Sequence, residues 1–66
     1  MVIDTAKIDI LLAERRWSKA KLAEKCGVTG QAVTKTLRRG TCRPETAGNI
    51  AKALGVHVAE IIKEVE

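Results

Sequence analysis

The side chains best suited to chemistry in this sequence share one face of a predicted helix near the middle of the chain. At about 100° per residue, this face consists of Gly30, Gln31, Thr34, Lys35 and Arg38. Val33 and Leu37 fall on the opposite face. The polar face offers hydrogen-bond donors and acceptors without an acid, so it could bind an anionic partner. Ordinary surface helices also carry polar stripes. The stripe alone therefore does not distinguish a binding face from an ordinary solvent-exposed face.

Residues that could support catalysis or bind a metal are few. Cys26 and Cys42 lack the close spacing of a metal site, and His57 has no evident nucleophile or carboxylate partner. Two cysteines in a cytosolic chain are usually reduced. We therefore expect no catalytic residue, no metal, no cofactor and no enzymatic activity, and nothing points to a small-molecule ligand.

Size and charge restrict the fold and the partners. A chain of 66 residues predicts one domain, spanning residues 1–66, with a small core. Its 12 lysines and arginines exceed its 8 acids, and the net charge of +4 is compatible with nucleic-acid binding. Trp17 is the only aromatic residue, which favours helices over sheets.

The N-terminal stretch does not resemble a targeting segment. It carries Asp4 and Asp9, where a signal peptide needs positive charge. Its longest apolar run, Ile10 to Ala13, is too short to span a membrane. We expect a cytoplasmic protein.

Capping and stopping residues predict five short helices. The first runs from about residue 5 to 15, with Asp4 or Thr5 as its cap. The next three are bounded by Ser18 and Gly27, by Thr29 and Gly40, and by Pro44 and Gly55; the last carries Val58, Ile61, Ile62 and Val65. Apolar residues at helical spacing give the expected core: Ile8, Leu11, Leu12, Leu22, Ala23, Cys26, Val33, Leu37, Ala47, Ile50, Ala51 and Leu54.

The second and third helices, about residues 18–38, form a predicted helix-turn-helix unit. Each begins with an apolar residue and a hydroxyl cap, Trp17-Ser18 and Val28-Thr29, a pattern typical of the hydrophobic staple. Gly27 is suited to the left-handed conformation that the tight turn requires. Two helices held across so short a turn form a rigid pair.

These residues carry a family resemblance. The stretch "WSKAKLAEKCGVTGQAVTKTLRRG", followed by "RPETAGNIAKALGV", resembles the phage-repressor and Cro class of helix-turn-helix domains, also named for the xenobiotic response element. Its hallmarks are the small Ala23, the glycine at Gly27, the β-branched Val33 and "IAKALGV" in the fourth helix. The resemblance implies an all-α, compact five-helix bundle of the lambda repressor-like type.

The resemblance also implies a function. It indicates a sequence-specific regulator of transcription from a prokaryote or phage, acting as a repressor, that inserts the third helix, about 29–39, in the major groove of double-stranded DNA. The residues implied to read bases are Thr29, Gly30, Gln31, Thr34, Lys35 and Arg38. Those implied to contact the DNA backbone are Ser18, Lys19, Arg39 and Arg43. Gly30 either leaves room for the duplex or is simply a missing side-chain contact.

The sequence departs from the family pattern in the third helix. This helix has one more residue before its terminal glycine than is commonest in the family. The extra residue affects the direction in which Arg38, Arg39 and Arg43 point. Thr36 occupies a position that is usually apolar in the family.

Partner predictions follow from the size of the domain. One small helix-turn-helix domain contacts few base pairs, so we expect a symmetric homodimer that places two such domains on the DNA. Its predicted interface residues are Ile61, Ile62 and Val65, with Val2 and Ile3 nearby. The alternative function is a protein-interaction module on the same scaffold, such as an antitoxin-type subunit.

Overall fold

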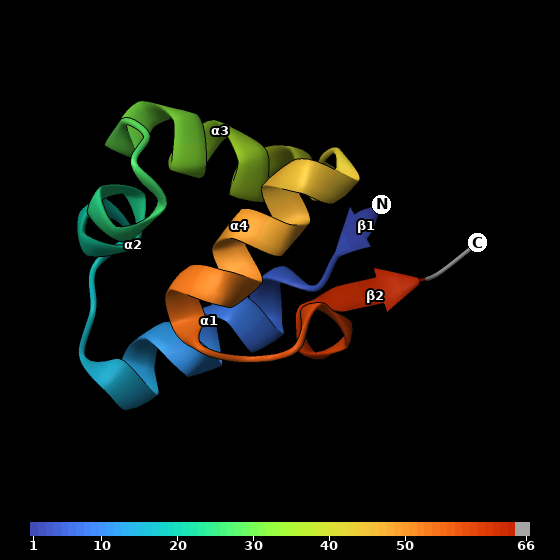
Figure 1. Cartoon of the computed structure of the whole chain (residues 1–66), viewed down its shortest axis with the longest axis horizontal. Coiled ribbons are helices and arrows are strands. Elements are labelled where there is room, and N and C mark those ends of the chain that lie inside the picture. The colour runs from blue at the N-terminus through green and yellow to red at the C-terminus, as the bar shows by residue number, and fades with distance from the viewer. Residues whose placement is uncertain (65–66) are drawn as a thin grey trace.

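The computed structural model of the chain describes residues 1–64, which form a bundle of helices joined to a small sheet made by the two ends (Figure 1). The elements in chain order are β1 (Val2–Ile3), α1 (Thr5–Arg15), α2 (Lys19–Cys26), α3 (Gly30–Arg39), α4 (Pro44–Leu54), the 3₁₀ helix η1 (Val58–Glu60) and β2 (Ile62–Glu64). Over the described residues, no helix combines the length and apolar character needed to cross a membrane.

The four predicted helices begin and end where their caps indicate. Side-chain oxygens of Asp4, Ser18 and Thr29 each accept a hydrogen bond of 3.1 Å from the backbone N–H three residues later. The glycines expected to end α2, α3 and α4 all do so. Local capping therefore sets the boundaries of these helices.

The predicted fifth helix is wrong, although the described residues are mostly helical, with four α-helices and one short strand pair. Residues 58–60 form a single 3₁₀ turn without a side-chain cap from His57. The chain then extends as β2, which pairs antiparallel with β1, Ile3 opposite Ile62. The β-branched Ile62 suits extended backbone, and the N–H of Asp4 bonds the carbonyl oxygen of the preceding residue, Ile61, at 2.7 Å. Pairing with the N-terminus thus replaces the helix.

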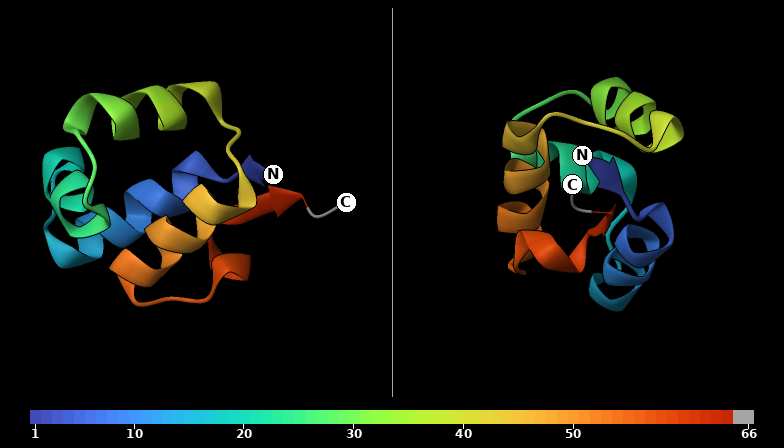
Figure 2. Two further views of the ribbon diagram at one scale, coloured as in Figure 1. Left: turned by 45° about the horizontal axis from the view of Figure 1, so that its top comes forward. Right: turned by 90° about the vertical axis from the view of Figure 1, so that its right-hand side faces the viewer.

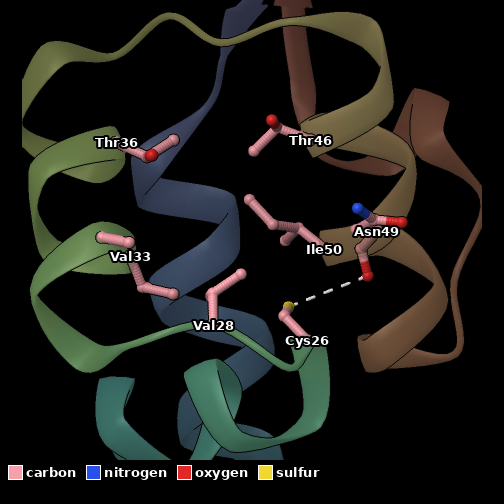
Figure 3. Close-up of a pocket in the computed structure, with 8 residues that line it drawn as sticks. Cys26, Val28, Val33, Thr36, Thr46, Asn49 and Ile50 are labelled. Atoms are coloured by element: carbon pink, nitrogen blue, oxygen red, sulfur yellow. Dashed lines mark hydrogen bonds between the residues drawn. The ribbon is translucent and has the colours of Figure 1, made fainter.

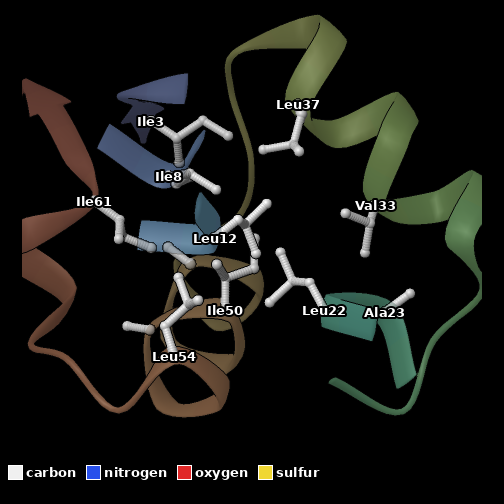
Figure 4. Packing of buried hydrophobic residues seen from close by; sticks show 12 residues of the cluster. Ile3, Ile8, Leu12, Leu22, Ala23, Val33, Leu37, Ile50, Leu54 and Ile61 are labelled. Carbon is white, nitrogen blue, oxygen red and sulfur yellow. The ribbon is translucent and has the colours of Figure 1, made fainter. Parts of the chain in front are cut away.

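The core lies between the helices and the strand pair (Figure 4). Ile8, Leu22 and Ile61 are its largest fully buried side chains, contributed by α1, α2 and the residue after η1. Ile3 from β1 is also buried. Trp17 is half-buried against this core, with the Lys25 ammonium 5.9 Å from the centre of its ring.

The helix α3 lies at the outer edge of the bundle in every view (Figures 1 and 2). Val33 and Leu37 are buried and attach it to the core, as predicted. It packs mainly on α2, which in turn packs on α4. One face of α3 is therefore held while the opposite face is open to a partner.

Candidate nucleic-acid interface

The open face of α3 holds the polar residues singled out in the sequence. Gly30, Gln31, Thr34, Lys35 and Arg38 line one open hollow on the surface. We call this set the polar face. Gln31, Lys35 and Arg38 are exposed, and Thr34 is half-buried. The structure brings together an amide, a hydroxyl and two cations with no carboxylate among them, a combination that favours an anionic partner rich in hydrogen-bonding groups.

The side chains of Thr29 and Ser18 cap the N-termini of α3 and α2. The Thr29 hydroxyl accepts from the N–H of Ala32, and the Ser18 hydroxyl accepts from the N–H of Lys21. Both side chains are exposed at helix N-termini, where the first backbone N–H groups have no partner within the helix. An anion placed there would meet free N–H groups and the positive end of the helix dipole.

Gly30 sits where α3 meets α2. A Cβ atom added there would lie 3.9 Å from the Cα atom of Ala20, an ordinary van der Waals distance. Its φ angle is not positive, whereas Gly27 has a φ of +74°. The backbone of α2 and α3 therefore requires a glycine at Gly27 and leaves room for a methyl group at Gly30.

Positive charge is concentrated in the helix-turn-helix region. Between residues 18 and 43, the basic residues are Lys19, Lys21, Lys25, Lys35, Arg38, Arg39 and Arg43, and Glu24 is the single acid. Glu24 lies 3.9 Å from the Lys21 ammonium in an exposed ion pair, which contributes little to stability. The excess charge of the protein thus lies on the segment that presents the polar face.

Arg39 and Arg43 extend this basic surface beyond α3. Together with Lys35 they line a hollow where α3 turns toward α4. Both arginines are exposed, and Arg43 stands at the start of α4 without a side-chain capping bond. Lys19 is exposed at the start of α2.

A feature missed by the sequence analysis braces the turn between Arg39 and Arg43. The N–H of Ile3 bonds the Gly40 carbonyl oxygen at 2.9 Å, and the N–H of Cys42 bonds the Met1 carbonyl oxygen at 3.0 Å. Val2 also pairs with Thr41. Because β1 is bound by β2 on its other edge, it ties the end of α3 to the C-terminal strand. No short-range pattern signals this pairing.

The cysteines are free thiols in the described structure. Burial raises the pKa of Cys26 above its usual value, and burial likewise raises the pKa of Cys42. A raised pKa lowers the fraction of each thiol that is present as the reactive thiolate at neutral pH.

The residues predicted for a dimer interface have different positions. Ile61 has 0% of its surface exposed and packs inside the core, so it has no side-chain surface to offer a second copy. Ile62 is half-buried against that core. Val65 lies outside the described residues. Of the two neighbours expected near this interface, Ile3 is buried and Val2 half-buried.

Comparison with known protein families identifies the family of this chain. A family model described as a Cro/C1-type HTH DNA-binding domain matches residues 7–65, from α1 through β2. No curated protein and no solved structure matches the chain. The matched range includes the helix-turn-helix unit and every residue of the polar face.

Proposed function

Because this chain belongs to the Cro/C1-type helix-turn-helix DNA-binding domains, we propose that it is a sequence-specific repressor of transcription. The polar face of α3 lies in the major groove, and the whole chain acts as a single domain. A protein bound there prevents other proteins from using the same DNA. The observation that carries the proposal is the acid-free polar face on the outer side of a firmly packed helix.

Base recognition falls to the exposed side chains of the polar face. The Gln31 amide can donate to and accept from adenine, and the Lys35 ammonium can donate to the acceptors of guanine. Thr34 can touch a thymine methyl group. Arg38, in the last turn of α3, reaches a base or a phosphate. Thr29 and Gly30 approach the groove through the helix N-terminus.

Backbone contacts fix the orientation of α3 on the duplex. Ser18 and Lys19 present a phosphate with a cation and the free N–H groups at the start of α2. Arg39 and Arg43 contact the phosphates beside the other end of α3, where β1 braces the turn that carries them.

A homodimer supplies a second copy of α3 to bind the DNA. Two copies related by a two-fold axis would place their α3 helices on half-sites about 34 Å apart, one turn of DNA. With Ile61 buried, the remaining predicted contact within the described residues is Ile62, half-buried at the start of β2.

The double variant Gln31→Ala plus Lys35→Ala tests the site. A duplex is first selected from a random pool with the wild-type protein, whose binding is expected to weaken steeply as salt increases. Each lost base contact costs about 1–3 kcal/mol, so the double variant should bind this duplex at least about tenfold more weakly. Fluorescence anisotropy measures affinity, and circular dichroism should show unchanged helicity.

Lys52→Ala is the matched control, because it also removes one exposed lysine but lies on α4, outside the polar face. Its affinity should stay close to that of the wild type. Equal losses of DNA affinity in the control and in the double variant would indicate that only the total positive charge matters. Full retention of specific binding by the double variant would overturn the assignment of the reading residues.

A further inference from the structure

A hollow of about 170 Å³ lies between α3 and α4 (Figure 3). The residues of α3 that line it do not belong to the polar face. Val28, Val33 and Ile50 form its apolar wall. These side chains come from the α2–α3 turn, from α3 and from α4, and they point into the space between the two helices. We call this space the α3–α4 hollow.

Polar groups lie around the same space. Thr36 from α3 and Thr46 from α4 face each other across it (Figure 3). Within the described residues, neither hydroxyl takes part in a side-chain hydrogen bond. The Cys26 thiol lines the hollow as well and donates a long hydrogen bond of 3.8 Å to the Asn49 carbonyl oxygen. The hollow thus combines apolar contact area with hydroxyl groups free to bond a ligand.

The size and lining define a class of ligand. An apolar cavity of about 150 Å³ is large enough for benzene, and ligand sites generally combine an apolar surface with a few polar groups. We propose that the α3–α4 hollow binds a compact, mainly apolar molecule of about one ring that carries a hydroxyl group. The ring would lie against Val28, which is 48% exposed, and over the buried Val33 and Ile50, and its hydroxyl would bond Thr36 or Thr46.

Thr36 is a short side chain at the edge of the hollow. Its side chain lines the hollow, and a leucine at this position would extend into the space between the helices. Threonine is shorter and places a hydroxyl at the same point. The substitution Thr36→Leu should therefore fill the hollow, and leucine is also a better helix former than threonine.

Occupancy of the hollow has a consequence for α3. The helix is buried through Val33 and Leu37, and Val33 also lines the hollow. A ligand there would change how α3 is seated relative to α4, and with it the aim of the polar face. This regulatory step rests on the proposed DNA-binding function, whereas ligand binding itself does not.

Phenol is a suitable probe, because it has one ring and one hydroxyl. Titration of ¹⁵N-labelled protein should shift the amide signals of Val28, Val33, Thr46 and Ile50 with a dissociation constant of about 1 mM, a weak affinity reasonable for so small a ligand. Thr36→Leu should remove these shifts while remaining folded. Ala13→Leu, which adds a leucine to the exposed face of α1, should leave them unchanged.

DNA binding is measured separately with the selected duplex. Saturating phenol should weaken the affinity of the wild type by about fivefold and leave that of Thr36→Leu unchanged. Absence of localised shifts, or equal shifts in Thr36→Leu, would overturn the ligand site. Localised shifts without any change in affinity would overturn the regulatory step alone. Failure of the wild type to bind DNA without phenol would count against the proposed function and not against the ligand site.

Discussion

Gly27 ends α2 and Gly30 begins α3, and a side chain would have opposite effects at the two positions. Gly27 has a φ of +74°, a left-handed conformation that costs a residue with a Cβ atom about 1–2 kcal/mol. Gly30 has an ordinary helical backbone, and a Cβ atom would contact the Cα atom of Ala20 at 3.9 Å. Gly30 is therefore not required by the protein's own packing.

The substitution Gly30→Ala should stabilise the fold by up to about 1 kcal/mol, because alanine has the higher helix propensity. Its methyl group would face α2 and not the groove, so affinity for the selected duplex should change by less than about twofold. Thermal unfolding and anisotropy measure the two quantities. Gly27→Ala is the control and should lower stability. A clear loss of DNA affinity in Gly30→Ala would show that the duplex approaches the backbone closely at this residue.

At the scale of elements, the two-residue strand β1 connects parts of the fold that are far apart in the sequence. It pairs with β2 on one edge and with the turn at residues 40–42 on the other. Ile3 is 3% exposed and anchors this strand in the core. The strand thus links the N-terminus, the C-terminal strand and the end of α3.

Replacing Ile3 with valine should lower the free energy of unfolding by about 0.5–1.5 kcal/mol, because one buried methylene is lost. The loss of packing should also speed hydrogen exchange at Cys42, whose N–H bonds the Met1 carbonyl oxygen. Urea denaturation and native-state exchange measure both effects. Ala6→Gly, at an exposed site in α1, is a control that lowers stability without changing a residue of β1 or of the turn at residues 40–42. Equal protection of Cys42 in Ile3→Val and the wild type would contradict the bracing role of β1.

At the scale of the whole molecule, the proposed homodimer requires a contact between two copies of the chain. The buried Ile61 removes one predicted contact from the surface, although Ile62 keeps partial exposure at the start of β2. A weak interface formed by such a short segment would be favoured further by binding of both copies to one duplex.

Sedimentation measures the oligomeric state directly. At micromolar concentration the protein is expected to populate a dimer of twice its 7.2 kDa mass, and addition of the selected duplex should increase that population. Ile62→Lys should shift the equilibrium toward monomer, with Lys52→Ala as a surface control. A single 7.2 kDa species in the absence of DNA, together with one chain bound per duplex after DNA is added, would contradict the homodimer.

The sequence determined the features that depend on neighbouring residues. Asp4, Ser18 and Thr29 cap helices through N–H groups three positions away, so the boundaries of α1, α2 and α3 followed from short stretches. The 3.6-residue period gave the buried and polar faces of α3 and the core residues of α4. The family followed from the same local patterns.

Tertiary structure decided the features that depend on residues far apart in the chain. The C-terminal segment has an apolar pattern that fits a helix, yet pairing with β1 makes it a strand and buries Ile61. The α3–α4 hollow depends on how far apart the two helices pack, which no spacing along the chain reveals. Capping energies are local, whereas strand pairing and the fit between helices arise only once the whole chain is assembled.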